Sequence, residues 1–335
     1  MKEALSFDDV LLVPQYSEIE SRSKVSTRSD LDSDNTYRLP VISSPMDTVT
    51  EVEMAKAMAK AGGLGVIHRY NTIDKQKDIF VACEGNPAVA IGATGDFMER
   101  ATYLFNHGAK IFCVDTAHGH HSAMRRCLSA LRERFDEDIH IMAGNVATRE
   151  AFDDLASWGA NSIRVGIGSG AICSTRLVAG SGMPVFQSII ECAKSTSNAA
   201  LIADGGVRTT GDMVKALAAG ADFVMIGSML AGTKESPGEI FTGNDGKKYK
   251  VYRGMASKAA QVDWRGSSST PEGISTTIPY KGKVSHVLAD IQGGINSGLS
   301  YSGCATIQEL RNKCEFIRQT PAGQHESYTH ILTRK

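Results

Sequence analysis

The sequence predicts an α/β fold, a closed (β/α)8 barrel of the TIM type. Eight short apolar runs alternate with segments whose apolar residues recur at helical spacing. Runs that are apolar throughout suit parallel strands, because such strands are buried on both faces. The length of 335 residues accommodates a barrel of about 250 residues with extensions. We therefore expect a single domain over residues 1–335.

The predicted elements follow one another in a regular order. The apolar runs place strands at 40–43, 65–68, 89–92, 110–115, 139–145, 162–165, 200–204 and 223–227. The amphipathic stretches place helices at 51–58, 72–83, 97–106, 122–135, 149–158, 187–193 and 211–219, with a last barrel helix at 284–296. Glycines such as Gly62-Gly63 and Gly220 end some of these helices. The polar stretch from Ser17 to Tyr37 precedes this rhythm, so we expect residues 1–39 to wrap the surface.

One interval interrupts the alternation. About fifty residues rich in Gly, Ser, Lys and Thr separate the eighth strand from the last helix. Long loops inside compact domains are usually lids or linkers. Because this one leaves the C-terminal rim, where such barrels place their active sites, we expect an active-site lid over about 233–282.

Composition limits the classes of partner. The formal net charge is −1, with 22% charged residues of mixed sign, which argues against a nucleic-acid partner. No run approaches the roughly 20 apolar residues of a membrane span, and residues 1–6 lack a signal-peptide core. Seven cysteines without a C-x-x-C pair indicate reduced thiols. We therefore expect a cytoplasmic protein with no membrane partner.

A glycine-rich loop over 163–176 carries the candidate nucleophile. Alternating glycines follow the sixth strand and allow the backbone to approach a ligand closely. Cys173 lies just past them, and a thiol in such a place is a candidate nucleophile. The competing interpretation is a tight turn with a structural cysteine, and the polar residues at the other strand ends favour the nucleophile.

Further polar residues and glycines follow the strands. Asp204-Gly205-Gly206 follows the seventh strand and Gly227-Ser228 the eighth, which suits a phosphate bound by backbone N–H groups. Asp204 suits a ribose diol, because a carboxylate accepts from two hydroxyls. We therefore expect a phosphorylated substrate. Other residues at strand ends are Ser44, Met46, His68, Arg69, Asp115, His118 and Asn145; for Asp115 and Asn145 a cap or turn is an equal alternative.

The histidines do not predict a metal centre. The cluster His118, His120 and His121 lacks the i, i+4 pair and the carboxylate of a zinc site. The carbonyl groups of Gly168 and Gly170 suit a monovalent ion instead, as carbonyl rings do elsewhere.

Motifs along nearly the whole chain resemble the IMP dehydrogenase/GMP reductase family. They occur in the family's order at 7–12 (FDDVLL), 44–50 (SPMDTVT), 115–119 (DTAHG), 143–146 (AGNV), 203–206 (ADGG), 225–232 (MIGSMLAG) and 252–255 (YRGM), together with the cysteine loop. Dehydrogenases of this family usually carry a CBS-domain pair after the second strand. Only residues 71–88 occupy that place here, so the resemblance implies a barrel without CBS domains.

The resemblance assigns roles to individual residues. It implies that Cys173 adds to C2 of the purine of a nucleoside monophosphate, with Thr175 and Glu272 as the proton relay. Asp204 would bind the ribose, and the phosphate would be bound by Gly206, Gly227, Ser228 and Tyr252. The other implied nucleotide contacts are Ser44, Met46, Asn145, Gly205, Gly254, Met255 and Gly273. The implied cofactor contacts are Ser21, Arg22, Arg69, Asp115, Thr116, Ala117, Ile167, Gly168, Tyr301 and Gly303. Potassium would be bound by carbonyl groups of Gly168, Gly170, Cys173 and Arg176, and the family implies a homotetramer.

Two reactions remain open under this resemblance. The lid favours a GMP reductase, because it is short and has no Arg-Tyr pair between Met255 and Glu272, whereas dehydrogenase lids use such an arginine to activate water. Ser21-Arg22-Ser23 also looks like the reductase pattern, and Arg22 and Arg69 suit the 2′-phosphate of NADPH.

Other features look closer to an IMP dehydrogenase that uses NAD. They are the motifs at 115–119, 177–180 and 227–228, and Ser269 where a reductase would have arginine. Arg265 is a substitute for either missing arginine, the one that activates water in dehydrogenases or the one expected at position 269 in reductases. Ala171 stands where the family typically has a serine that contacts the phosphate. A third alternative is a non-catalytic or altered-substrate nucleotide-binding protein, against which the retention of Cys173, Thr175 and Glu272 counts.

Overall fold

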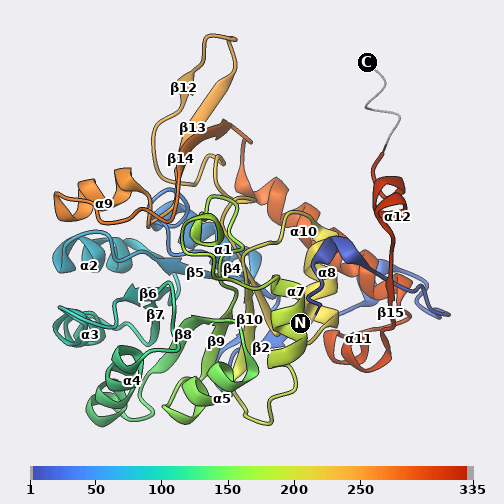
Figure 1. Cartoon of the computed structure of the whole chain (residues 1–335), viewed down its shortest axis with the longest axis horizontal. Helices are drawn as coiled ribbons and strands as arrows, with labels where there is room; N and C mark the ends of the chain where they lie inside the picture. Colours follow the sequence, from blue (N-terminus) through green and yellow to red (C-terminus); the bar gives the residue numbers. More distant parts are fainter. Residues whose placement is uncertain (1–2, 330–335) are drawn as a thin grey trace.

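The computed structural model describes residues 3–329 and confirms the predicted (β/α)8 barrel. Eight parallel strands close on one another in the order β10-β11-β4-β5-β6-β7-β8-β9 (Figure 1). Their bounds lie within about a residue of the predicted ones: β4 (Val41–Ser43), β5 (Leu64–Ile67), β6 (Ala88–Ile91), β7 (Ile111–Asp115), β8 (His140–Val146), β9 (Ser162–Val165), β10 (Ala200–Asp204) and β11 (Phe223–Ile226).

Helices follow the strands and cover the outside of the barrel. They are α1 (Val52–Ala61), α2 (Ile73–Ala82), α3 (Phe97–Asn106), α4 (Ser122–Phe135), α5 (Arg149–Ser157), α6 (Thr175–Val178), α7 (Val185–Cys192), α8 (Thr210–Ala218) and α10 (Val284–Tyr301). Threonines begin several of them, because the Thr72, Thr148 and Thr209 hydroxyls accept a bond from the first-turn backbone. Between β5 and β6 the chain holds only α2 and short connections.

Helix α10 continues to Tyr301, beyond the end predicted at residue 296. The prediction stopped early because glycines interrupt the apolar pattern. In the structure they bring α10 close to α8: a Cβ on Gly294 would lie 2.5 Å from Thr210, and one on Gly298 would lie 2.5 Å from Val214. These glycines therefore allow α10 and α8 to pack closely against each other.

The N-terminal end of the barrel is closed by a small hairpin, β2 (Ser29–Asp30) with β3 (Thr36–Tyr37). Leu31 of its turn is 2% exposed and packs with apolar side chains of the barrel strands. Buried His140 of β8 contacts the Asp32 carboxylate through Nδ1, and its Nε2 lies 2.7 Å from Ser162 Oγ. A ligand therefore reaches the barrel from the opposite, C-terminal end.

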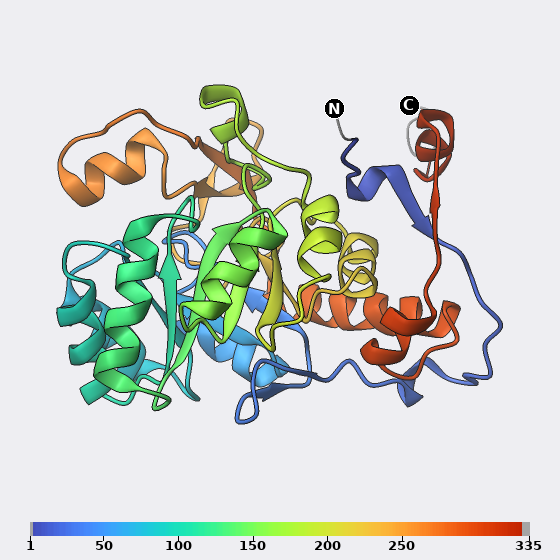
Figure 2. The ribbon, with the colours of Figure 1, turned by 60° about the horizontal axis from the view of Figure 1, so that its bottom comes forward.

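The two ends of the described chain pair with each other outside the barrel. The 3-10 helix η1 (Phe7–Asp9) leads into β1 (Val10–Leu12), which pairs antiparallel with β15 (Phe316–Arg318). The N-terminal segment then passes through η2 (Arg22–Lys24) and runs beneath the barrel (Figure 2). Helices α11 (Ile307–Lys313) and α12 (Pro321–Glu326) flank β15.

The predicted lid segment is folded rather than irregular. It forms an antiparallel sheet of β12 (Phe241–Thr242), β13 (Lys248–Arg253) and β14 (Ser275–Pro279), with α9 (Lys258–Arg265) between the last two strands. Figure 2 shows this orange segment above the barrel. Arg253 anchors it: the guanidinium donates to Asp47 Oδ2 at 2.6 and 2.9 Å and also pairs with Asp263 of α9.

Candidate active site

The loop after β9 approaches the neighbouring strand end more closely than most residues allow. Gly166 has φ +151°, and a Cβ there would lie 1.9 Å from the Asp204 carbonyl oxygen. Gly205 has φ +84°, and a Cβ there would lie 2.8 Å from Ser169 Oγ. Glycine at both positions therefore packs the cysteine loop against the turn after β10, which brings Cys173 beside Asp204.

Cys173 is the one exposed thiol of the seven cysteines, all of which lie within residues 3–329. Burial raises the pKa of Cys113, Cys127 and Cys192 to about 12 and that of Cys83 to about 11. Burial raises the pKa of Cys304 and Cys314 as well. Since the thiolate is the reactive form, these six thiols are poor nucleophiles and Cys173 is the accessible one.

A hydroxyl and a carboxylate continue from the thiol. Cys173 Sγ lies 3.2 Å from Thr175 Oγ1, and Thr175 Oγ1 donates to Glu272 Oε2 at 2.8 Å. Thr175 is the first residue of α6 and not its N-cap, which is Ser174. The hydroxyl is therefore used for the contact with Glu272 rather than for capping.

The lid backbone is bonded directly to the cysteine loop. Ser174 N–H donates to Glu272 O at 2.9 Å, and Ile274 N–H donates to Ile172 O at 3.0 Å. A Cβ on Gly273 would lie 3.2 Å from Ser257 N and 3.4 Å from Ile172 O. The backbone position of Glu272 is thus fixed relative to Cys173 from both sides.

A cavity of about 470 Å³ gathers most of the residues predicted to bind the nucleotide. A Cβ on Gly227 would lie 3.2 Å from both Met46 Sδ and Tyr252 Oη and 3.5 Å from Ser44 Oγ, so these three side chains converge there. Burial raises the pKa of Tyr252, so its hydroxyl stays a proton donor. The predicted residues lining this cavity are Ser44, Met46, Cys173, Asp204, Gly205, Gly206, Gly227, Ser228, Tyr252, Gly254, Met255, Glu272 and Gly273.

Asn145 lines a second cavity that adjoins the first. It also contacts Asp204, the carboxylate that is predicted to bind the ribose. Its Nδ2 donates to Asp204 Oδ2 at 2.8 Å. Arg164 of β9 donates to the same oxygen from Nη2 at 2.8 Å and from Nε at 3.1 Å, and its Nη1 donates to Asp115 Oδ1 at 2.6 Å. Arg164 was not among the predicted site residues. Its signal was a lone charged residue inside a strand that is otherwise buried.

The adjoining cavity, of about 390 Å³, gathers residues predicted to bind the cofactor: Arg69, Asp115, Thr116, Ala117, Ile167 and Gly168. Thr116 Oγ1 donates to Gly144 O at 2.9 Å. Arg69 Nη2 donates to Asp115 O at 3.4 Å, whereas the buried Nε of Arg69 has no hydrogen-bond partner within residues 3–329. The two cavities share Cys173, Asp204 and Glu272.

Four predicted cofactor residues line neither cavity within one chain. Arg22 stacks over the Tyr301 ring at 5.8 Å, and the Ser21 side chain caps η2. Gly303 has φ +61°, and a Cβ there would lie 2.2 Å from Tyr16 O. These residues form a group of their own around the C-terminal end of α10.

Carbonyl groups of the cysteine loop fit a monovalent cation in their chemistry. Gly168 O and Cys173 O receive no hydrogen bond from the described part of the chain, and Gly170 O accepts only Cys173 N–H at 3.0 Å. The Arg176 side chain donates to Met183 O at 2.6 Å. Residues 3–329 contain no group of three His, Cys, Asp or Glu placed to bind a metal ion. His120 pairs instead with Asp154 at 2.8 Å.

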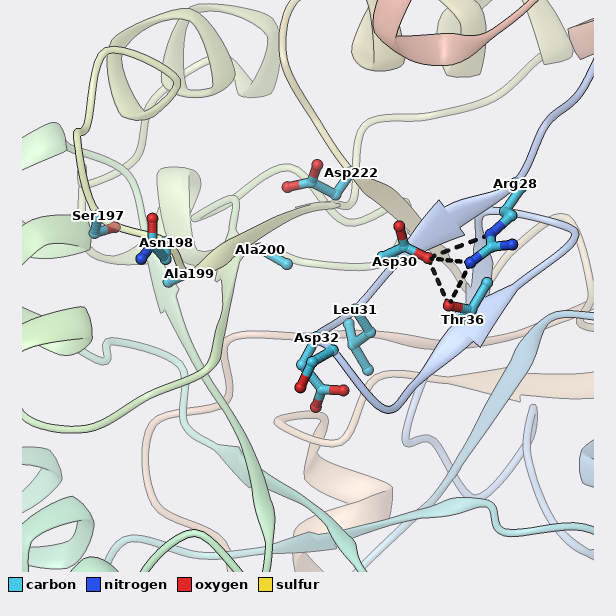
Figure 3. A pocket seen from close by; sticks show the side chains of 11 residues that line it. Arg28, Asp30, Leu31, Asp32, Thr36, Ser197, Asn198, Ala199, Ala200 and Asp222 are labelled. Atoms are coloured by element: carbon cyan, nitrogen blue, oxygen red, sulfur yellow. Dashed lines mark hydrogen bonds and ion pairs between the residues drawn. The ribbon is translucent and has the colours of Figure 1, made fainter.

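A further hollow of about 540 Å³ lies at the opposite end of the barrel (Figure 3). Its charged groups already have partners among the described residues. Arg28 contacts Asp30 and Thr36, while Asp222 accepts Leu201 N–H at 2.6 Å and pairs with Arg311. The hollow therefore offers no group in need of a ligand.

None of the described helices has the length and apolar character needed to span a membrane.

Comparisons with known proteins agree with this geometry. A sequence model of the IMP dehydrogenase / GMP reductase domain matches residues 4–330. The chain is 34% identical to an inosine-5′-monophosphate dehydrogenase of Nitrosopumilus maritimus, covering 98% of both chains. It is 37% identical to the enzyme of that name from Borreliella burgdorferi, covering 98% of this chain and 97% of the other.

A solved structure of a cysteine-to-alanine variant of GMP reductase from Trypanosoma brucei, in complex with guanosine 5′-monophosphate, superposes with a TM-score of 0.93. That protein is 28% identical to this one, and the match covers 98% of both chains. The chain therefore belongs to the IMP dehydrogenase/GMP reductase family of oxidoreductases.

Proposed function

We propose that this protein catalyses the NADPH-dependent reductive deamination of GMP to IMP and ammonia. The observation that carries the proposal is the line of contacts from Cys173 Sγ through Thr175 Oγ1 to Glu272 Oε2, at 3.2 and 2.8 Å. This line joins a candidate nucleophile to a candidate proton relay beside a cavity of nucleotide size. A structural relative of the chain was solved with guanosine 5′-monophosphate, which supports the substrate class.

In this proposal the nucleotide occupies the cavity beside Gly227. Asp204 Oδ2 already accepts three hydrogen bonds, which leaves Oδ1 for a ribose hydroxyl. The N–H groups of the glycine turns after β10 and β11, together with the Tyr252 hydroxyl, suit the phosphate. The purine then lies toward Cys173, Met255 and Glu272.

The reaction proceeds in two stages at C2 of the purine. The Cys173 thiolate forms a bond to C2, and the C2–N2 bond breaks as the amine takes a proton and leaves as ammonia. The product of this stage is a thioimidate between Cys173 and the purine. A hydride then adds to C2, the S–C2 bond breaks with its electrons on sulfur, and IMP is released. The sum is GMP, NADPH and two protons giving IMP, NADP⁺ and ammonium.

Glu272 and Thr175 supply the proton in the first stage. Glu272 approaches the cysteine from the lid while Thr175 approaches it from α6, where the Thr175 hydroxyl donates to Glu272. A hydroxyl can also accept a hydrogen bond, so it is able to pass a proton on. General acid catalysis by such a positioned group typically contributes about 10²–10⁴-fold to the rate. The lid also excludes water, which would otherwise hydrolyse the thioimidate.

The adjoining cavity would hold the cofactor. Arg69 fits an anionic dinucleotide, because its buried Nε is a cationic donor with no hydrogen-bond partner in residues 3–329. When bound, NADPH supplies the hydride. Arg22 lies outside this cavity, so we propose a homotetramer in which the group of Ser21, Arg22, Tyr301 and Gly303 serves the cofactor of a neighbouring copy. Potassium would be bound by the carbonyl groups of Gly168, Gly170 and Cys173, with Arg176 completing the predicted set.

The lid favours the reductase over the dehydrogenase. A dehydrogenase must activate water after the cofactor leaves, and no Arg-Tyr pair lies between Met255 and Glu272. The alternative is oxidation of IMP to XMP with NAD, and the names of the relatives favour it. Arg265, the last residue of the lid helix α9, would then be the residue that activates water.

Chromatography of the purine products tests the proposal. The enzyme is incubated with GMP and NADPH, and separately with IMP and NAD, in potassium buffer. The proposal predicts IMP and an equal amount of ammonia from the first mixture. XMP from the second mixture, with no product from the first, would support the dehydrogenase instead.

A further inference from the structure

Four charged side chains alternate in sign across the mouth of the barrel. Arg69 Nε lies 3.9 Å from Asp115 Oδ2, Asp115 Oδ1 accepts from Arg164 at 2.6 Å, and Arg164 donates to Asp204 at 2.8 Å. All four residues line the cofactor cavity, and Asp204 also lines the nucleotide cavity. The row of charges therefore connects the two cavities.

Arg164 is the central member of this row. It projects from β9, is 6% exposed, and uses Nε and Nη2 on Asp204 and Nη1 on Asp115. A buried cation requires such partners, because its desolvation is costly without them. The planar guanidinium holds several donors in fixed directions, so both carboxylates are oriented by one rigid group.

Each carboxylate depends on Arg164 for its strongest contacts. Within residues 3–329, the Asp204 carboxylate otherwise accepts only the neutral Asn145 amide, on the same Oδ2 atom. Asp115 otherwise faces Arg69 at 3.9 Å, beyond hydrogen-bond distance. Without Arg164, the negative carboxylates of Asp115 and Asp204 would lose the cation between them and the contacts that hold them in place.

We propose that Arg164 is a positioning residue that orients the ribose carboxylate Asp204 and the cofactor-side carboxylate Asp115 together, and so sets the affinity of both cavities. This inference rests on the proposed function for the assignment of nucleotide and cofactor to their cavities. It predicts that a change at Arg164 weakens the binding of both the nucleotide and the cofactor, whereas a change at Asp115 weakens the binding of the cofactor alone.

Calorimetry with the Cys173→Ala variant tests this without turnover. GMP is titrated into the protein, and NADPH is titrated into the GMP complex. The same titrations follow with Arg164→Met, Arg164→Lys or Asp115→Asn added. Arg132→Met is the matched control, because Arg132 is also largely buried but bonds the backbone carbonyl groups of Gly159 and Ile139 away from both cavities.

Loss of hydrogen bonds to charged groups predicts that Arg164→Met raises the Kd of both GMP and NADPH at least about tenfold. Arg164→Lys, which keeps the charge without the planar donors, gives intermediate values and protects the test if the methionine variant does not fold. Asp115→Asn raises the Kd of NADPH alone. Arg132→Met lowers the melting temperature and leaves both Kd values within about twofold.

Two outcomes would overturn the inference. One is unchanged Kd values for both ligands in a folded Arg164 variant. The other is a change confined to one ligand, because Arg164 would then serve a single cavity. Failure of the Cys173→Ala protein itself to bind GMP or IMP would instead contradict the proposed function.

Discussion

Thr175 Oγ1 donates a hydrogen bond to Glu272 Oε2 at 2.8 Å, across 97 positions of sequence. Thr175 begins the short helix after the cysteine loop, and Glu272 belongs to the lid. The contact makes the lid part of the site: without the fold of β13, α9 and β14 the Glu272 carboxylate would not lie beside Thr175 and Cys173. The position of Glu272, the candidate proton donor, therefore depends on the fold of the lid.

Alkylation tests the identity of the nucleophile. Because six thiols are buried or half-buried, iodoacetamide should label Cys173 first and abolish turnover, and bound GMP should slow the labelling. Mass spectrometry of peptides locates the label. Cys173→Ala should lose turnover while keeping nucleotide binding. Appreciable activity in that variant would contradict the covalent mechanism.

Replacement of the lid carboxylate tests the proton relay. Glu272→Gln keeps the shape but cannot donate or accept the proton, so kcat should fall by about 10²–10⁴-fold. Stopped assays across pH measure the effect. Thr175→Ser is the matched control, because it keeps the hydroxyl between Cys173 and Glu272. A wild-type rate for Glu272→Gln at every pH would reduce Glu272 to a structural lid residue.

The ion pair between Arg253 and Asp47 should matter for nucleotide binding. Arg253 lies between Tyr252 and Gly254, both of which line the nucleotide cavity, and bonds Asp47 at 2.6 and 2.9 Å. Arg253→Met should therefore raise the KM for nucleotide by about tenfold or more. Asp263→Asn is the control: the Asp263 side chain is 63% exposed, and exposed ion pairs contribute little, so KM should change less than about twofold. Equal effects of both variants would refute the role of Asp47.

The carboxylate at the bottom of the barrel should make stability depend on acid pH. Burial of Asp32 raises its pKa, but hydrogen bonds from His140 and Asn35 outweigh burial and hold the pKa well below the ordinary value. A carboxyl whose pKa is lower in the folded state stabilises the fold above its unfolded pKa of about 3.9. That contribution is lost as pH falls below about 4. Melting temperatures from pH 7 to pH 3 should fall less steeply for Asp32→Asn, and parallel curves would contradict this.

The periodicity of the sequence was sufficient for the barrel but not for the lid. Strands such as 162–165 and 200–204 are buried along almost their whole length, and both were placed with their observed bounds. The sheet of β12, β13 and β14 has exposed faces and polar residues, as in the Ser275–Pro279 strand, so it lacks the apolar signal of a buried strand. The pairing of β13 with β14 joins residues far apart in the chain, such as Tyr249 and Pro279, which no local pattern contains.

Much of the candidate site followed from residues at strand ends, because parallel strands in a barrel direct those ends to one rim. Glu272 came only from family resemblance, since no local pattern marks it. Arg164 was missed because a single charge within an apolar run gives no indication of its partners, Asp115 and Asp204, which lie on two other strands. Likewise, no local pattern indicates that Arg22 and Arg69 lie in two separate groups, because their positions depend on the whole fold.

Absorbance at 340 nm distinguishes reductive deamination of GMP from oxidation of IMP. One cuvette holds the enzyme with GMP and NADPH and another holds it with IMP and NAD, both with potassium, and each is repeated with Cys173→Ala. Reductive deamination through Cys173 predicts a fall in absorbance in the first cuvette with the wild-type protein only. A rise confined to the second cuvette would contradict reductive deamination and assign the protein to IMP oxidation.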